Sequence, residues 1–356
     1  MGKLRKFNLA ALILLVSMVW GFAAAGGGAK SADAGLIKVM TFNVRTAAAN
    51  DNTEGINNNW NAGRKQRAFK MIAAADPDII GVQEAIDGAY GSQVTDLKNL
   101  PGYNWYGVGR DDGKDQGEHE GVMYRASRFT LKDQGQFWIS KTPDVPGTTF
   151  ATCKMSPTWD CHNPRMATWV VLLDQVTNNR YFVLNQHWAL PAETQPMSAA
   201  LIRQKVGELS KGLSVIMTGD LNMTDAPPDH PYGNNIYDAY DQLINGKDQK
   251  GPDPKLVDAY RGLHPRIDTD NCPPGETTYH GYHGGTFFYD YFENKEDEGH
   301  NYRIDFILAS PDFEVLQAEI MRSSGGGLGI SASGLGQWPS DHYPVTVVLT
   351  PSASRK

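Results

Sequence analysis

The amino-acid sequence predicts an α/β protein, of the α+β kind, in which two packed, mainly antiparallel sheets are flanked by helices. A strand, a helix and a second strand follow one another between residues 36 and 83. Most later apolar segments are short and strand-like, and helices separate only some of them. No internal repeat or heptad pattern is present, and no apolar run after residue 35 is long enough to span a membrane.

The first strand–helix–strand unit follows from the spacing of apolar residues. Leu36–Val44 is expected to be a strand, and Arg64–Ala75 is expected to be a helix. The helix is indicated by an apolar stripe at helical spacing, formed by Ala68, Met71, Ile72 and Ala75. Asp78–Gln83 then reads as a buried strand that carries Glu84 at its C-terminal end.

The remaining elements are expected in the following order. Strands are predicted at 121–124, 136–139, 168–173 and 181–186, with a hairpin turn at Asn178 and Asn179 between the last two. A helix over 198–210 precedes a short buried strand at 215–218. Residues 223–301 read as long loops at the active face, with weak helical stretches near 236–243 and 256–260. Strands resume at 303–308, 313–320 and 343–349.

The N-terminus has the pattern of a secretory signal peptide. Basic residues precede an apolar run from Leu9 to Ala25, and the small-x-small sequence Ala32-Asp33-Ala34 follows. The alternative is a retained membrane anchor, but the run is short for a span of about 20 residues. We therefore expect residues 1–34 to be removed, residues 35–356 to form a single catalytic domain, and the protein to be secreted or periplasmic.

Charge and cysteine content limit the partners. The formal net charge is −7, which argues against sequence-independent nucleic-acid binding, since such binding needs a basic face. Nucleic acid is therefore expected as a substrate only, no cofactor beyond a metal is indicated, and we expect a monomer. Cys153 and Cys161 could form a disulfide in an oxidising compartment, with Cys272 left over, or all three could be thiols.

Polar residues recur where predicted strands end. Asn43, Glu84, His187, Asp220 and Asn222 each follow an apolar run. In α/β sheets, ligands bind in the crevice at strand ends. Each residue also has a structural explanation, such as a strand cap or a Gly-Asp turn, but the coincidence of all five favours a site.

The segment Ser340-Asp341-His342 completes a set that suits cleavage of a phosphate ester. Such cleavage needs a hard cation with oxygen ligands, a directed water and donors for the phosphoryl oxygens. We expect Mg²⁺, with Mn²⁺ as an alternative. The expected metal ligands are Asn43, Glu84 and Asp341.

The remaining candidates receive catalytic roles. Asp220 is expected to orient or deprotonate the water, and Asn222 to hold the scissile phosphate. His342 can meet the developing negative charge, with Asp305 fixing its tautomer. A second pair is His187, which could protonate the leaving oxygen, and Glu118, which could orient His187.

These residues, in this order, resemble the endonuclease/exonuclease/phosphatase superfamily over residues 36–349. The most specific motifs are Gly219-Asp220-Leu221-Asn222 and Ser340-Asp341-His342. The resemblance implies a four-layer α/β sandwich, the metal and catalytic roles given above, and a leaving-group histidine at His187. Segments 107–113, 137–143 and 165–169 are similar to those of secreted bacterial hydrolases in the superfamily. Within them, Arg110 and Arg165 are expected to contact the substrate phosphate, because a guanidinium matches phosphate oxygens.

The leading interpretation is an exported, magnesium-dependent phosphoesterase, acting on diesters in preference to monoesters. The first alternative is an extracellular nuclease. The second is a phospholipid or sphingomyelin hydrolase that touches a membrane through the aromatic segment Thr286–Phe292. The alternative from another class is a binding module without activity. A zinc site among His280, His283 and His300 matches no usual zinc spacing.

Overall fold

Two six-stranded sheets form the centre of the protein. The computed structural model describes residues 35–150, 163–225, 236–246, 254–266, 275–285, 288–290, 295–297, 303–322 and 335–352. The expected leader, the three cysteines and His300 lie outside these residues, as do the side chains of Thr286–Phe292, so the expectations about them stay predictions. None of the described helices is both long enough and apolar enough to cross a membrane.

The first sheet has the strand order β17–β18–β1–β4–β8–β7. Only the β1–β4 pair is parallel, and the other four neighbouring pairs are antiparallel. The strands are β17 (Phe313–Ile320), β18 (Val345–Pro351), β1 (Ile37–Asn43), β4 (Ile79–Ala85), β8 (His119–Arg125) and β7 (Tyr103–Tyr106).

The second sheet has the order β13–β16–β12–β11–β10–β9. It repeats the pattern, since only β11 and β12 pair in parallel. The strands are β13 (Val257–Asp258), β16 (Asp305–Ala309), β12 (Ser214–Asp220), β11 (Arg180–His187), β10 (Met166–Asp174) and β9 (Phe129–Trp138). Three short ribbons complete the strands of the described residues: β2 (Asn52–Thr53) with β3 (Ile56–Asn57), β5 (Asp87–Gly88) with β6 (Gly91–Ser92), and β14 (Phe288–Asp290) with β15 (Lys295–Asp297).

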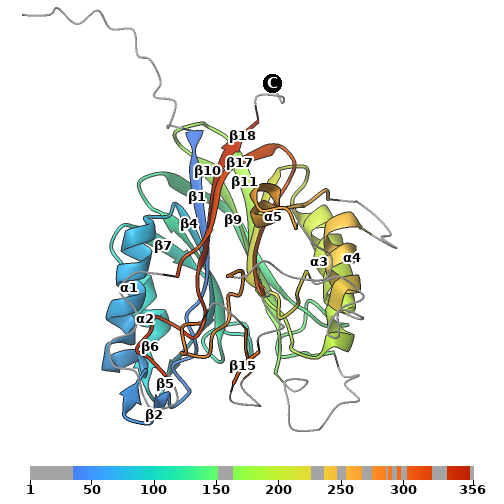
Figure 1. The fold of residues 1–356 in the computed structure, drawn as a ribbon. Coiled ribbons are helices and arrows are strands. Elements are labelled where there is room, and N and C mark those ends of the chain that lie inside the picture. The colour runs from blue at the N-terminus through green and yellow to red at the C-terminus, as the bar shows by residue number, and fades with distance from the viewer. Residues whose placement is uncertain are drawn as a thin grey trace, which may run out of the picture. The chain divides into compact units, whose positions relative to one another are not determined.

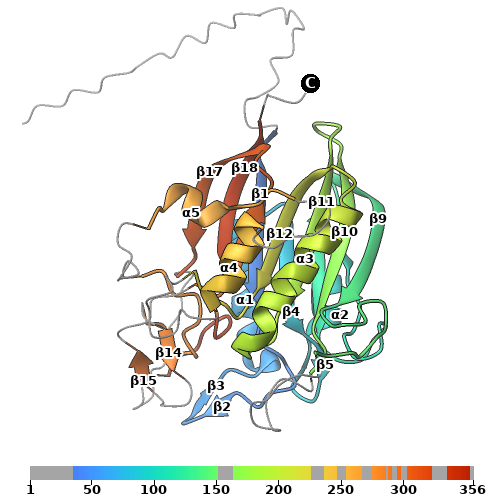
Figure 2. The same cartoon turned by 90° about the vertical axis from the view of Figure 1, so that its right-hand side faces the viewer.

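Helices cover the outer faces of both sheets (Figure 1). Helices α1 (Arg64–Ala75) and α2 (Gln93–Lys98) lie beside the first sheet, and α3 (Gln195–Leu209) and α4 (Ile236–Asn245) beside the second, as the turned view in Figure 2 also shows. Two 3-10 helices, η2 (Trp60–Ala62) and η3 (Ala192–Thr194), precede α1 and α3. The predicted layered α/β fold with two mainly antiparallel sheets is confirmed.

Local predictions agree well where apolar spacing was clear. Helix α1 and strand β17 have the predicted bounds. One stretch was wrong: the helix expected near 256–260 is strand β13 followed by helix α5 (Ala259–Leu263). The reason is Asp258, whose carboxylate accepts hydrogen bonds from the backbone N–H groups of Tyr260 and Arg261. Asp258 is therefore the N-cap, and the helix begins at Ala259.

Side-chain alternation along the strands separates three apolar layers. Residues such as Met40 and Phe42 pack with Met71 and Ile72 of α1 on the outer face of the first sheet. The outer face of the second sheet packs against α3 and α4 through residues that include Phe182, Ile202, Val206 and Met217. A third cluster fills the space between the sheets, including Val39, Ile79, Val122, Val183 and Ile216.

The face of each central strand that points between the sheets changes from apolar to polar along its length. On β1 this face reads Ile37, Val39, Thr41, Asn43. On β11 it reads Tyr181, Val183, Asn185, His187, and on β12 it reads Ile216, Thr218, Asp220. The polar ends meet at the end of the sheets from which β5 and β6 emerge (Figure 1).

Asn185 joins the two sheets at this change from apolar to polar. Its amide nitrogen donates to the carbonyl oxygens of Val82 (2.8 Å) and Gly121 (3.0 Å) in the first sheet. Its amide oxygen accepts from Gln83 Nε2 (2.6 Å) and Thr218 Oγ1 (2.9 Å). Asn185 is fully buried, so all of these bonds are made away from water, where an unmade bond is costly.

We predict that Asn185→Ala lowers the free energy of unfolding by about 3 kcal/mol, because it leaves several buried polar groups without partners. Urea denaturation followed by circular dichroism measures this loss. The exposed Asn179→Ala in the β10–β11 turn is the control and should change the value by less than about 0.5 kcal/mol. Equal effects of the two substitutions would contradict the role given to Asn185.

Candidate active site

Sheet register brings the polar strand ends together. His187, Asp220 and Asp305 lie opposite one another on the neighbouring strands β11, β12 and β16. Asn43, at the end of β1, lies opposite Gln83 on β4, one residue before Glu84. The sheets therefore place these predicted residues at one edge, as the sequence analysis expected from their positions at strand ends.

Asn43 links the two sheets at the centre of the site. Its amide nitrogen donates to Glu84 Oε1 (2.8 Å) and to Asp220 Oδ2 (2.9 Å). Its amide oxygen accepts the backbone N–H of Arg45 (2.9 Å). In this arrangement Asn43 holds two carboxylates close together. It turns its amide nitrogen toward them, and not the amide oxygen that the predicted role of metal ligand requires.

Glu84 has an unusual backbone conformation. Its φ angle is 63°, in the left-handed region, and the β4–β8 pairing has a bulge between Val82 and Ala85. Its other carboxylate oxygen accepts the backbone N–H of Thr46 (3.0 Å). Such a conformation persists only where surrounding contacts enforce it. Here it turns a partly exposed carboxylate toward Asp220.

Asp220 and Asn222 are held by the turn that follows β12. Asp220 Oδ1 accepts the backbone N–H of Asn222 (3.0 Å), and Asn222 has a left-handed φ of 46°. The Asn222 amide nitrogen donates to the carbonyl of Trp188 (3.0 Å) and lies 3.2 Å from His187 Nε2. A carbonyl can only accept, so this nitrogen is a donor and His187 Nε2 accepts from it.

His342 and Asp305 form the predicted carboxylate–imidazole pair. His342 Nδ1 lies 2.9 Å from Asp305 Oδ2, and its Nε2 lies 3.8 Å from Asp220 Oδ2. The Ser340 hydroxyl donates to the carbonyl of Asn43 (2.7 Å) and accepts from the backbone N–H of His342 (3.2 Å). These bonds fix His342 beside Asp220.

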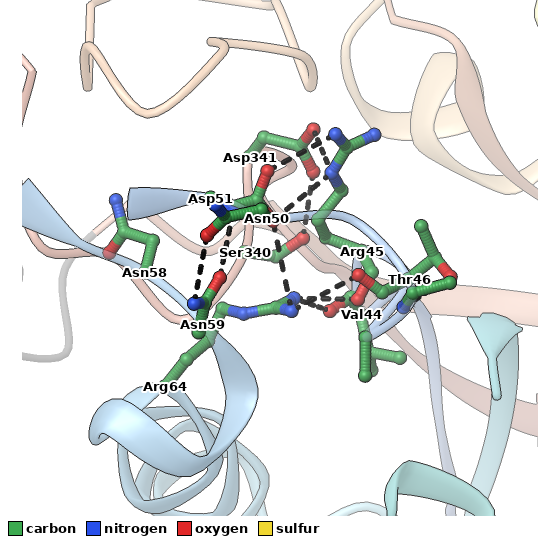
Figure 3. Close-up of polar contacts among 12 residues, drawn as sticks. Val44, Arg45, Thr46, Asn50, Asp51, Asn58, Asn59, Arg64, Ser340 and Asp341 are labelled. Atoms are coloured by element: carbon green, nitrogen blue, oxygen red, sulfur yellow. Dashed lines mark hydrogen bonds and ion pairs between the residues drawn. The ribbon is translucent and has the colours of Figure 1, made fainter. Parts of the chain in front are cut away.

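Asp341 contacts Ser340 and Arg45, and burial, together with the charge of Glu84, raises its pKa. Its Oδ1 accepts from the Ser340 hydroxyl (3.1 Å), and its Oδ2 lies 3.6 Å from Arg45 Nε. Arg45 also pairs with Asp51 through Nη2 (3.2 Å). Figure 3 shows Asp51 and Asp341 converging on the Arg45 guanidinium, with Asn59 below Asp51.

A second charged group surrounds His187. The structure pairs Glu118 with Arg110, whereas the sequence analysis expected it to orient His187. The carboxylate within ion-pair distance of His187 Nδ1 is that of Glu120, at 3.7 Å. Arg165 is buried, and its charge is felt by both glutamates and by His187. Arg110 and Arg165 thus lie on the His187 side of the site.

Burial and neighbouring charges shift the acidities of these groups. Burial, with the nearby Asp305, raises the pKa of Asp220 to about 7. Burial lowers the pKa of His342, but Asp305 outweighs this effect and raises it to about 10. Burial and the charge of Arg165 lower the pKa of His187 well below its ordinary value. At neutral pH, His342 is therefore protonated and His187 is neutral.

Within the part of the chain that the structure describes, two groups of side chains have donor atoms close enough to hold a cation. Glu84, Asp220 and His342 form one group, and Glu118, Glu120 and His187 form the other, each with its donor atoms within 4.8 Å of one another. The carboxylates of the second group already interact with the guanidinium groups of Arg110 and Arg165. In the first, His342 is protonated by its pairing with Asp305 and cannot ligate a metal in that state. Carboxylate oxygens from Glu84 and Asp220 suit a hard divalent ion, so the residues of the first group fit one.

Two residues of the site were missed by the sequence analysis. Glu120 could have been found, because it alternates with Val122 and Tyr124 and must face the space between the sheets. Arg45 gave no comparable signal, since its position depends on a left-handed turn after β1 and on the distant Asp341. His280 is buried against Trp338 and Tyr343, and this packing agrees with an ordinary loop histidine.

Glu120 gives a prediction about pH. Burial raises its pKa to about 8, above its ordinary value of about 4.3, so the wild-type protein loses stability as pH rises through this window. Glu120→Gln cannot ionise, so it does not lose this stability. The free energy of unfolding of Glu120→Gln minus that of the wild type should therefore rise by more than about 1 kcal/mol between pH 5 and pH 8. Denaturation at both pH values measures this. The exposed Glu314→Gln should show no such gain, and parallel curves for Glu120→Gln and wild type would contradict the prediction.

Comparison with known proteins identifies the family. The family model described as the Endonuclease/Exonuclease/phosphatase family matches residues 40–342. A comparison with curated protein sequences finds no match.

Solved structures give the same answer. An endonuclease/exonuclease/phosphatase family protein from Bacteroides thetaiotaomicron is 29% identical, with a TM-score of 0.66 and coverage of 90% of this chain and 99% of that chain. A mannosyl-6-phosphatase from the same organism is 30% identical, with a TM-score of 0.65 and coverage of 88% and 99%. The human Nocturnin catalytic domain is 16% identical, with a TM-score of 0.56 and coverage of 89% and 95%, and it shows likeness of fold alone.

The family model spans most of the chain, and the family is generally dependent on a divalent metal ion. Together with the carboxylate, amide and histidine groups assembled at the sheet edge, this match shows that the chain belongs to the endonuclease/exonuclease/phosphatase family of phosphoric ester hydrolases.

Proposed function

We propose that the protein is an exported, magnesium-dependent phosphoesterase in which Asp220 activates a water molecule against the phosphorus of a phosphate ester. The observation that carries this proposal is the position of Asp220. Its carboxylate lies between the amide of Asn43 and the imidazoles of His187 and His342, at 2.9, 3.6 and 3.8 Å. This geometry joins a proton acceptor to a metal-binding carboxylate through a single amide.

The ionisation states support this division of roles. Without a bound cation the pKa of Asp220 is about 7. A cation beside it would lower this pKa, so the carboxylate would be ionised and able to accept a proton at neutral pH. His342 keeps its proton, so it can donate a hydrogen bond to phosphoryl oxygens and stabilise their negative charge. His187 is neutral and accepts from Asn222 through Nε2. It must gain a proton before it can serve as the acid expected from the sequence.

Glu84 and Asp220 would hold the metal ion. The other two predicted ligands are their neighbours: Asn43 bonds to both carboxylates, and Asp341 interacts electrostatically with Glu84. A bound Mg²⁺ would polarise the phosphoryl oxygens and lower the pKa of the attacking water. Arg110 and Arg165 are buried on the side of His187, where they would contact phosphate oxygens. Asn222, which is partly exposed, would hold the scissile phosphate.

Two substrate classes follow from different observations. The sequence analysis favours phosphodiesters. The likeness to a mannosyl-6-phosphatase across 88% of this chain favours phosphomonoesters of sugars as the second candidate. Nucleic acid fits the acidic chain less well, and the lipid alternative depends on an aromatic segment whose side chains lie outside the described residues. Export from the cell and a monomeric state belong to the proposal as well.

The test compares hydrolysis of bis-p-nitrophenyl phosphate, p-nitrophenyl phosphate and mannose 6-phosphate by the purified chain with Mg²⁺ or Mn²⁺. We expect turnover that a chelator abolishes. Asp220→Asn should lower kcat by at least about 10²- to 10⁴-fold, because it removes the general base. Glu84→Gln should abolish activity at low metal concentration and regain part of it at high concentration.

Asp87→Asn is the matched control, because Asp87 is an exposed carboxylate three residues beyond Glu84. It should keep the kcat and metal requirement of the wild type. Turnover that survives chelation, or a fully active Asp220→Asn protein, would refute the proposed mechanism. Absence of turnover on all three esters, on DNA and on phospholipid would instead favour the binding-module alternative.

A further inference from the structure

We propose that Arg45 is a phosphate-binding residue of this site, and that its guanidinium binds a non-bridging oxygen of the substrate's phosphoryl group. The inference rests on the proposed function, since it requires a phosphate ester at the Glu84–Asp220 pair. The sequence predicts phosphate contacts for two other arginines, Arg110 and Arg165.

The backbone of Arg45 is held in a conformation that few residues adopt. Its φ angle is 57°, in the left-handed region. Its N–H donates to Asn43 Oδ1 (2.9 Å), and its carbonyl accepts from Arg64 Nη1 (2.6 Å) and Gln93 Nε2 (2.7 Å). Arg64 is itself completely buried. Three independent bonds therefore fix where the Arg45 side chain leaves the backbone.

The guanidinium is fixed along one edge (Figure 3). Nε and Nη2 bind the two oxygens of Asp51 (3.3 and 3.2 Å), and Nε also lies 3.6 Å from Asp341 Oδ2. Asp51 is held in turn by the Asn59 amide, which accepts its backbone N–H (2.7 Å), and by the Tyr282 hydroxyl (3.1 Å). The Arg45 fork is thus oriented before any ligand arrives.

The other edge of the guanidinium is open to a ligand. Nη1 makes no hydrogen bond or ion pair with any residue in the described parts of the chain, and the side chain is 30% exposed. By contrast, Arg64 is completely buried and binds the carbonyls of Val44, Arg45 and Thr46. Arg45 therefore differs from a purely structural arginine in having an unused donor at the protein surface.

A phosphate that binds beside Glu84 needs a cationic partner there. Glu84, Asp220 and Asp341 gather in one small region, and their negative charges repel a phosphate. A planar guanidinium matches two phosphate oxygens and remains charged at every physiological pH. The Arg45 and Asp51 side chains are only 30% and 10% exposed. An ion pair shielded in this way is weak evidence for stability, because the cost of desolvation offsets much of the attraction, so stability alone gives little reason for two carboxylates to hold this guanidinium beside the site.

The experiment measures two affinities of the purified chain. The dissociation constant of Mn²⁺ is obtained by electron paramagnetic resonance. The dissociation constant of inorganic phosphate, in the presence of saturating Mn²⁺, is obtained by calorimetry. We compare wild type with Arg45→Gln, Arg45→Lys, Asp51→Asn and Arg125→Gln. Arg125 is the matched control, because it is 26% exposed and pairs with two aspartates. It ends strand β8, whereas the site residue Glu120 lies near the start of that strand.

We expect Arg45→Gln to weaken phosphate binding on the order of 10- to 100-fold, with Mn²⁺ affinity within about twofold of wild type. Arg45→Lys and Asp51→Asn should give intermediate losses, and Arg125→Gln should give none. Unchanged phosphate affinity in Arg45→Gln, or a loss matched by an equal loss of Mn²⁺ affinity, would overturn the inference. In the second case Arg45 would only neutralise Asp341.

Neither readout requires turnover, so failure of the proposed catalytic function appears separately, as a wild-type protein that binds phosphate without hydrolysing esters.

Discussion

The structure depends on a single constraint: polar groups buried between the two sheets are shielded from water, so each one left without a hydrogen bond is costly. Asn185 meets this constraint by bonding across the sheets to Val82 and Gly121, and by accepting from Gln83 and Thr218. Gly81 shows how close the sheets come here, because a Cβ atom at this position would lie 1.9 Å from Thr218 Oγ1. Beyond Asn185 the layer between the sheets turns polar, and the residues there can form a site because the sheets are already fixed.

The same constraint explains the ionisation of the site. Carboxylates crowded into a buried layer must share protons, pair with cations or bind a metal ion. Each solution is present in a different part of the site. Glu118 pairs with Arg110, Asp305 pairs with the His342 cation, and Asp220 has a pKa raised to about 7. The Glu84–Asp220 pair, bridged only by the neutral amide of Asn43, is where a divalent cation gives the greatest relief of repulsion.

Much of this could be predicted from the sequence, because strand alternation and strand ends follow local patterns. Helix α1 and the positions of Asn43, Glu84, His187 and Asp220 at strand ends are such local features. Contacts that depend on side-chain direction could not be predicted. The pairing of Glu118 with Arg110, the approach of Glu120 to His187, and the left-handed turn that aims Arg45 at Asp341 arise from packing between segments distant in the chain. The start of α5 was misplaced because the capping bonds of Asp258 outweigh the apolar spacing.

We expect the metal ion to bind the Glu84–Asp220 pair and not the second acidic group. A crystal of the protein grown with Mn²⁺ and measured near the manganese absorption edge would show which group binds it, because anomalous scattering locates the ion without any assumption about activity. The strongest anomalous peak should lie beside the carboxylates of Glu84 and Asp220. A strongest peak among Glu118, Glu120 and His187 would contradict this expectation and would require the roles of the two acidic groups to be exchanged.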